Sequence, residues 1–325
     1  MKYAFHGAFA PYIYGLIEKK RSLGYDYYES ERILRTFDEF CREQFPCETH
    51  LTAKIVMRWA EQTGTEQNLF RLNRVSVIRE LARHMNSVGC QAYILPLDFT
   101  KKTGRHIPYI FSYEELARLF REIDSCAPSL NAPTRHLVVS VIFRMIYCCG
   151  LRPVEARRLR REDVSLRDGV VKILESKGHK DRTVVVADDL LQLMRRYAEK
   201  VAAIYPDCPF FFPRYDGMGA YSKVWAVETF WRCFQMGGLT QFDGPRPRVY
   251  DFRHTFATEC ICRWMREGKD VDAMLPFLSA YMGHARFEDT AYYIHMVPDF
   301  YQRTGKLDVS AYETLLPEVY HEDQE

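Results

Sequence analysis

The chain has 325 residues, of which 47% are hydrophobic and 27% are charged, and its formal net charge is +2. This length is long for one domain and sufficient for two, each with its own core. The composition excludes a disordered chain, and no apolar run is long enough to span a membrane. We expect a cytoplasmic protein. Because the net charge is small, any nucleic-acid partner must be bound by local groups.

The first hundred residues have apolar positions at helical spacing. Four segments, 9–21, 33–40, 51–62 and 67–89, predict four short helices that form a small bundle. Residues 94–111 then contain prolines, a glycine and basic groups without periodicity, as is typical of a linker between domains. We therefore expect a second domain to begin near residue 108.

The second half begins with a capping box, in which Ser112 precedes Glu115 at the start of a helix. An apolar helix follows over residues 134–150. Residues 169–186 predict two β-branched strands joined by a polar turn, and helices resume towards the end. The expected fold is mainly α with a small antiparallel β-sheet (α+β).

The ten cysteines include no CxxC pair. Those at 148–149 and 260–262 lie in apolar, helical stretches. Free, buried cysteines in a reducing compartment explain this pattern better than disulfides or zinc ligands. No group of carboxylates, cysteines or histidines has the spacing of a metal site, so we expect no metal.

Two short motifs can each be interpreted either as part of a functional site or as an ordinary solvated surface feature. Gly150 ends one helix and Arg152 begins the next, where an arginine is unfavourable unless an anion is bound. A surface arginine after a glycine is the alternative. The turn "SKGHKDR" carries Lys177, Lys180 and Arg182. It is either a solvated basic turn or a hairpin that brings one lysine into a site.

Two later stretches complete a pattern of five motifs. Residues 249–264 place Arg253 and His254 at a helix start, and residues 278–295 contain His284 and two adjacent tyrosines. The order GLRxxE, SKGxKxR, RHTFAT, MGH and TxxYxH resembles the tyrosine recombinases, also called the phage-integrase family. The resemblance implies a two-domain architecture like that of Xer and Cre. It has a core-binding helical domain (1–95), a linker (96–107), a catalytic domain (108–305) and a tail (306–325) that would pack on a neighbouring subunit.

The resemblance implies a chemistry for five positions. In this family a tyrosine attacks a DNA phosphodiester, forms a 3′-phosphotyrosyl bond and releases a 5′-hydroxyl, without metal or nucleotide cofactor. Arg152 and Arg253 match the arginines that neutralise the phosphate. Lys177 matches the lysine that protonates the leaving oxygen. Glu155 matches an acidic position that orients the site, and His284 matches a histidine that binds the phosphate.

The family resemblance also identifies the nucleophile, through the number of residues between the histidine and the attacking tyrosine. The family interval from the histidine at 284 to the attacking tyrosine is nine residues, which selects Tyr293. Its neighbour Tyr292 would be rotated by about 100° around a helix and should pack or face away.

One position departs from the family pattern. Three residues before Arg253 the family usually has a histidine, proposed as the base or as a phosphate contact, and this chain has Tyr250. The identity of the base is therefore open. His254 belongs to the usual RHTFAT run and is not an obvious substitute. We expect Tyr250 to donate a hydrogen bond to the phosphate, and the positive field of the two arginines to favour the Tyr293 phenolate.

The partners implied by the resemblance are double-stranded DNA recombination sites, bound by a homo-tetramer on two paired sites, with or without partner recombinases. Further DNA contacts are less defined, because solvation of a helix face explains each basic residue equally well. The candidates are Arg71, Arg74, Arg79 and Arg83 in the fourth predicted helix, and Lys180 in the basic turn.

The implied function is site-specific recombination for integration, excision or transposition of a mobile element. Departures from Xer-like sequence, Tyr250 among them, favour a mobile element over a resolvase of DNA dimers. One alternative is an activity like that of type IB topoisomerases, which nick and rejoin DNA without pairing two sites. The other is a DNA-binding relative that has lost catalysis, which the retention of both arginines, Lys177, His284 and Tyr293 disfavours.

Overall fold

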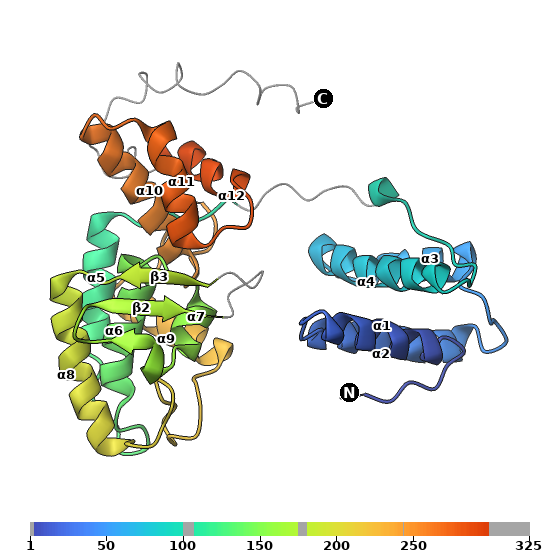
Figure 1. Ribbon diagram of the computed structural model, residues 1–325, viewed down its shortest axis with the longest axis horizontal. Helices are drawn as coiled ribbons and strands as arrows, with labels where there is room; N and C mark the ends of the chain where they lie inside the picture. The colour runs from blue at the N-terminus through green and yellow to red at the C-terminus, as the bar shows by residue number, and fades with distance from the viewer. Residues whose placement is uncertain (1–2, 100–106, 175–180, 243, 299–325) are drawn as a thin grey trace. The chain divides into compact units, whose positions relative to one another are not determined.

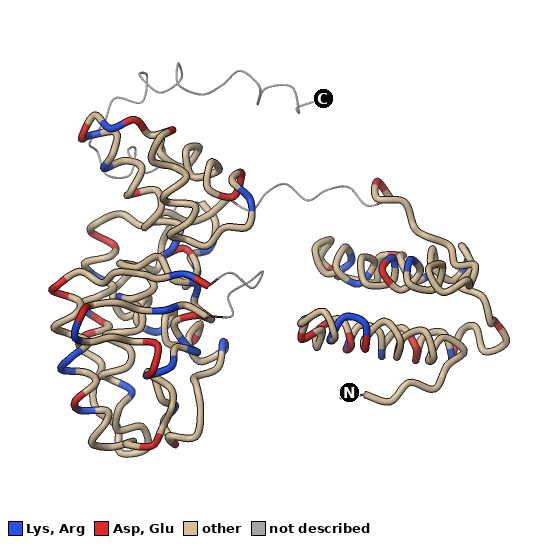
Figure 2. Tube along the Cα trace, viewed as in Figure 1, with Lys and Arg blue, Asp and Glu red and all other residues tan. Residues whose placement is uncertain are grey.

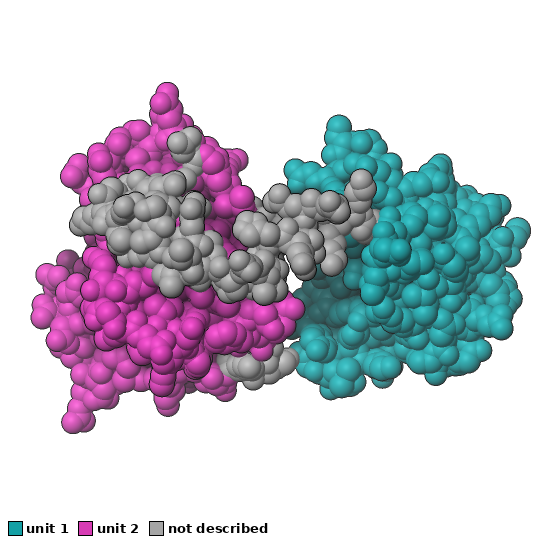
Figure 3. Space-filling view, turned by 90° about the horizontal axis from the view of Figure 1, so that it is seen from above, with its two compact units in different colours: residues 1–106 teal, residues 107–325 magenta. Residues whose placement is uncertain are grey.

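The structure is a computed structural model that describes residues 3–99, 107–174, 181–242 and 244–298. The chain divides into two compact units, residues 1–106 and 107–325, which Figure 3 shows in teal and magenta. The division falls inside the predicted linker, and the domain bounds 1–95, 108–305 and 306–325 remain predictions. Lys177, Lys180 and the predicted tail lie outside the described residues.

The first unit contains the four predicted helices (Figure 1). Three of them, α1, α2 and α3, each pack against α4. The predicted apolar stripe of α1 is buried, with Ile13 and Ile17 fully enclosed, and α2 buries Leu34 and Phe37 in the same core. The helices are α1 (Ala10–Ser22), α2 (Tyr28–Gln44), α3 (Ala53–Ala60) and α4 (Asn68–Ser87), followed by a short 3₁₀ turn, η1 (Leu97–Phe99).

The second unit is mainly helical and contains one small sheet (Figure 1). The predicted capping box is present, since the Ser112 hydroxyl accepts from the Glu115 N–H at 3.2 Å and the Glu115 carboxylate accepts from the Ser112 N–H at 2.8 Å. The helices are α5 (Tyr113–Asp124), α6 (Arg135–Cys148), α7 (Pro153–Arg158), α8 (Asp188–Ile204), α9 (Lys223–Met236), α10 (Asp251–Arg266), α11 (Val271–Met282) and α12 (Glu288–Ala291), with 3₁₀ turns η2 (Arg161–Asp163) and η3 (Tyr292–Met296).

The sheet has the antiparallel order β1-β2-β3. The predicted hairpin forms β2 (Val170–Ile173) and β3 (Arg182–Val185), and β1 (Val164–Ser165) was not predicted. Val171 pairs with Val184, and both are buried in a core that they share with apolar residues of α5, α6, α8 and α9. The fold class expected from the sequence is confirmed.

Helix α10 contributes to two separate cores, and this positions the functional residues. Phe252 belongs to the core beside the sheet, whereas Ala257 and Ile261 pack with residues of α11 and η3. Because both sides of α10 are packed, its first turn is held firmly, and that turn carries Arg253 and His254.

The distribution of charged residues and the state of the cysteines can be compared with what the composition predicts. Figure 2 shows basic and acidic positions interspersed along both units. None of the ten cysteines forms a disulfide; Cys47 and Cys148 are exposed, and Cys90 and Cys126 partly buried, rather than buried as expected. No helix in the described part of the chain is long and apolar enough to cross a membrane.

Candidate active site

Arg253 lies at the centre of the candidate site and is fully buried. Its Nη1 donates to the carbonyl of Gly150 at 2.5 Å, and its Nη2 donates to the carbonyl of Met282 at 2.5 Å. Nη2 also lies 3.1 Å from His284 Nε2. Burial lowers the pKa of Arg253, but an arginine remains charged at neutral pH. A fixed positive charge is therefore held between α6, α10 and the end of α11.

Arg152 reaches the same place from the turn after α6. Gly150 has a φ of +58°, and a Cβ there would lie 2.5 Å from the ring of Phe256. Glycine is required because the backbone is left-handed and the neighbouring ring leaves no room. The turn makes Arg152 the N-cap of α7, where its guanidinium donates to the Gly283 carbonyl and to the Glu155 carboxylate, at 2.8 and 2.7 Å.

Glu155 joins two arginines from different elements. Its carboxylate accepts from both terminal nitrogens of Arg182, at 2.9 and 2.7 Å, and from Arg152. Burial alone would raise the pKa of Glu155, but its bonds to Arg182 and Arg152 lower it to about 2. The carboxylate therefore supplies a negative charge beside Arg152 at the N-terminus of α7.

Arg182 is a residue whose role the sequence did not reveal. It was grouped with the basic turn, but its side chain is only 6% exposed, and its Nε donates to the Tyr281 carbonyl at 2.8 Å. It therefore supports Glu155 from β3 instead of projecting into solvent. Its position at the end of the turn, directly before the β-branched run 183–186, was the available signal.

His284 follows the left-handed Gly283 that ends α11. Its Nδ1 lies 2.7 Å from the Thr290 hydroxyl, and its Nε2 lies 3.1 Å from Arg253. Burial, together with the charges of Arg253 and Arg152, lowers the pKa of His284 to about 4. The ring is therefore neutral at neutral pH. Because arginine can only donate, Nε2 accepts here, and Nδ1 carries the proton.

Tyr293 is buried in η3, with its hydroxyl 3.1 Å from Nδ1 of His254. Burial raises the pKa of Tyr293, and the nearby charges of Arg253 and Arg152 lower it by less. The expected field of the arginines is present and favours the phenolate, but desolvation is the larger effect and keeps the pKa of Tyr293 above its usual value. Tyr292 is only partly buried, with its ring 6.4 Å from that of His295.

Tyr250, the residue that departs from the family pattern, also lies at this site. It is 36% exposed at the N-cap of α10, and its ring centroid is 5.1 Å from that of His254. Burial would lower the pKa of Arg152, but the bonds of its guanidinium to Glu155 and to Tyr250 raise it overall. The Tyr250 hydroxyl is thus next to a guanidinium and partly open to solvent.

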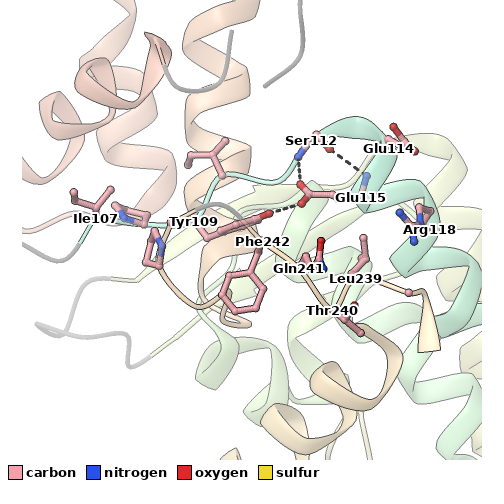
Figure 4. A pocket seen from close by; sticks show the side chains of 15 residues that line it. Ile107, Tyr109, Ser112, Glu114, Glu115, Arg118, Leu239, Thr240, Gln241 and Phe242 are labelled. Carbon is pink, nitrogen blue, oxygen red and sulfur yellow. Dashed lines mark hydrogen bonds between the residues drawn. The ribbon is translucent and has the colours of Figure 1, made fainter. Parts of the chain in front are cut away.

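The structure therefore brings six predicted residues together: Arg152, Glu155, Tyr250, Arg253, His284 and Tyr293. It also adds His254 and Arg182. A separate pocket, lined by residues from the segments 107–118, 238–242 and 244–245, includes none of these residues (Figure 4). There Tyr109 donates to Glu115, which also closes the capping box of α5.

The arginines of α4 in the first unit have a different environment. Arg79 is 8% exposed, and its guanidinium donates to the carbonyls of Leu95 and Pro96 at 2.8 and 2.9 Å. Arg74 forms an ion pair with Glu66 at 2.7 Å and also donates to nearby backbone carbonyls. These contacts favour a structural role for both residues over the predicted DNA contacts, because each guanidinium joins α4 to another segment of the first unit.

The other two arginines of α4 differ in exposure. Arg71 donates to the carbonyl of Ala60 at 2.6 Å and lies over the ring of Phe99. Arg83 is exposed. Arg83 therefore has the environment that a phosphate contact from α4 would need.

Comparison with known proteins agrees with this geometry. Residues 111–299 match the Phage integrase family. A putative integrase/recombinase of Sinorhizobium fredii, y4rE, is 31% identical over 305 residues, which cover 91% of each chain.

Two solved structures share the fold. The XerH site-specific recombinase bound to palindromic difH DNA aligns with a TM-score of 0.63 and 19% identity, over 88% of this chain and 78% of XerH. The Tn1549 transposon integrase in complex with a circular intermediate DNA aligns with a TM-score of 0.60 and 14% identity, over 87% of this chain and 94% of that one. Since the family match spans more than half of the chain, the chain belongs to the phage integrase family and is a tyrosine-type DNA recombinase.

Proposed function

We propose that this chain is a site-specific recombinase that breaks and rejoins double-stranded DNA with Tyr293 as its nucleophile. The observation that carries the proposal is the Tyr293 hydroxyl, which is buried beside the charges of Arg253 and Arg152 and in contact with a histidine. The phenol oxygen attacks phosphorus to form a 3′-phosphotyrosyl bond. The bond to the 5′ oxygen breaks, and Lys177 protonates that oxygen.

The two arginines suit the charge that develops on the phosphate. Each guanidinium is already held by backbone carbonyls, and Arg152 is also held by Glu155. Little reorganisation is then needed when a phosphate binds, which is the main source of electrostatic catalysis. His284 can donate to a phosphate oxygen from Nε2 once its proton moves to that nitrogen and Thr290 donates to Nδ1.

The proposal includes a homo-tetramer on two paired DNA sites and a role in moving a mobile element. XerH and the Tn1549 integrase were solved with recombination-site and transposon DNA, which supports DNA sites of this kind as substrates. Tyr250 at the usual histidine position favours a mobile element over a Xer-like resolvase. Arg83 and Lys180 are the proposed additional phosphate contacts.

The nucleophile is tested with a pool of DNA duplexes of randomised sequence that carry a nick in one strand, called here the nicked pool. Cleavage near the nick releases a short fragment, so that the covalent protein–DNA complex is trapped and appears on a denaturing gel. Tyr293→Phe should abolish the complex, whereas the matched control Tyr292→Phe should retain it. The reverse pattern would refute the assignment.

Pairing of sites is tested separately. A captured sequence is placed twice in one supercoiled plasmid, and the wild-type chain should delete or invert the segment between the copies. Relaxation of supercoils without exchange between the copies would instead indicate the topoisomerase-like alternative.

A further inference from the structure

We propose that His254 is the base that removes the proton from the Tyr293 hydroxyl, a role that rests on the function proposed above. His254 is the residue after Arg253 in the first turn of α10. Its Nδ1 lies 3.1 Å from the phenol oxygen of Tyr293, although the two residues are 39 positions apart in the chain. Their ring centroids are 5.5 Å apart, at an angle of 51°.

A base is needed because Tyr293 is a protonated phenol in this site. Burial raises its pKa more than the charges of Arg253 and Arg152 lower it. A phenol attacks phosphorus poorly, and its proton must leave as the new bond forms. The group that accepts the proton must lie within hydrogen-bond reach of the phenol oxygen.

The other titratable groups of the site are engaged elsewhere. His284 uses one ring nitrogen for Thr290 and the other for Arg253. The Glu155 carboxylate is bonded by Arg182 and Arg152, which makes it a very weak base. Tyr250 lies beside the ring of His254 and next to the Arg152 guanidinium. His254 is therefore the group with both the chemistry and the contact.

Asp251 acts as a positioning residue behind His254. Its buried carboxylate lies 4.0 Å from His254 Nε2, and it is fixed by the backbone N–H of Arg248 at 2.8 Å and by the Arg248 guanidinium at 2.9 Å. A negative charge near Nε2 favours the tautomer with its proton on that nitrogen, which leaves Nδ1 free of hydrogen. It also stabilises the imidazolium that forms. Tyr293, His254 and Asp251 therefore form a chain of contacts in which a base activates the nucleophile and a carboxylate orients the base, as at other activated nucleophiles.

The proton balance covers both directions of the reaction. In cleavage, the hydrogen moves from the Tyr293 oxygen to Nδ1 of His254 while the oxygen–phosphorus bond forms. The leaving 5′ oxygen receives a different proton, from Lys177. In rejoining, the 5′-hydroxyl attacks phosphorus and returns its proton to Lys177, and the departing tyrosine oxygen recovers its proton from His254.

The experiment separates proton transfer from simple hydrogen bonding. His254→Asn keeps an amide oxygen that can accept a hydrogen bond but cannot take a proton. With the nicked pool, we expect covalent complex to form about 10²–10⁴-fold more slowly than in the wild type. The same variant is then made with 3,5-difluorotyrosine at position 293, whose phenol is more acidic and depends less on a base. The chain with both changes should form covalent complex at a rate within about tenfold of a chain that keeps His254 and has the same fluorinated tyrosine.

Each result has one meaning. A wild-type rate in His254→Asn would overturn the proposal, since an acceptor that takes no proton would then suffice. A slow variant that binds the DNA pool normally but is not rescued by the fluorinated tyrosine would also overturn it, because His254 would then be structural. A covalent complex in Tyr293→Phe would instead refute the proposed function itself.

Discussion

Buried arginines occur in both units of this protein, but only in the second unit does the guanidinium described here lie beside reactive side chains. Arg79 in α4 donates to the carbonyls of Leu95 and Pro96 and so fixes the segment that follows its own helix. Arg253 in α10 also donates to two carbonyls, but it touches His284, and its charge acts on Tyr293.

The comparison shows that burial and backbone bonds alone do not identify a phosphate-binding arginine. In both units the carbonyls hold a long, flexible side chain in one conformation. The distinguishing feature is what else the guanidinium faces. For Arg253 and Arg152 that is a group of reactive side chains, whereas Arg74 faces Glu66 and backbone carbonyls at the end of α3 and just after it.

The largest effect is expected at Lys177, which we propose as the acid that protonates the leaving oxygen. Lys177→Ala should slow cleavage by about 10²–10⁴-fold, because an alkoxide is a poor leaving group without a proton donor. A substrate with a 5′-bridging sulfur leaves readily, so it should rescue Lys177→Ala but not His254→Asn. If the sulfur substrate gives no rescue, Lys177 binds DNA instead, and Lys180 becomes the next candidate for the acid.

A matched pair of substitutions tests the comparison directly. Arg152→Lys keeps the charge but loses the planar fork, and cleavage should fall by about 10²–10³-fold, as for loss of one preorganised donor. Arg74→Lys makes the same change in α4. It should leave cleavage unchanged and lower the free energy of unfolding by about 1.5–3 kcal/mol through a lost charged hydrogen bond.

Cleavage is measured with the nicked pool at saturating DNA, and stability by urea unfolding. Slow cleavage and weak DNA binding in Arg74→Lys, with stability unchanged, would mean that the α4 arginines bind DNA and would remove the distinction between the units.

A smaller effect is expected at Tyr250, which borders the reactive group. Its hydroxyl would donate one hydrogen bond to a phosphate oxygen, and losing such a bond costs about 1.5–3 kcal/mol, or roughly ten- to two-hundred-fold in rate. Tyr250→Phe should fall in this range, and Tyr250→His should stay active. Complete loss of cleavage in Tyr250→Phe, with folding and DNA binding intact, would make Tyr250 an essential proton-transfer group and would argue against His254.

Removal of metal ions by a chelator is expected to leave the rate of DNA cleavage unchanged. In the proposed mechanism the arginines and Lys177 supply the positive charge that a metal would bring to the phosphate. Cleavage of the nicked pool should therefore proceed at the same rate in excess EDTA. Loss of activity that magnesium restores would show that the charges around Tyr293 are insufficient.

The sequence by itself determined most elements and the family. The helices of both units follow from apolar periodicity, the start of α5 from Ser112 and Glu115, and the hairpin from β-branched runs, because each signal is local in the chain. The five ordered motifs predicted the site residues that the structure brings together. The two-residue strand β1 was missed, since so short a segment has no pattern of its own.

Tertiary structure decided the parts that depend on contacts between distant segments. Arg182 appeared to be one more cation of a basic turn, but packing of β3 against α11 buries it on Glu155, 27 residues away. His254 appeared to be an ordinary member of its motif, but the packing of η3 on α10 places it on the Tyr293 hydroxyl. Burial also outweighs the field of the arginines at Tyr293, because the cost of removing a charge from water depends on the whole surrounding structure.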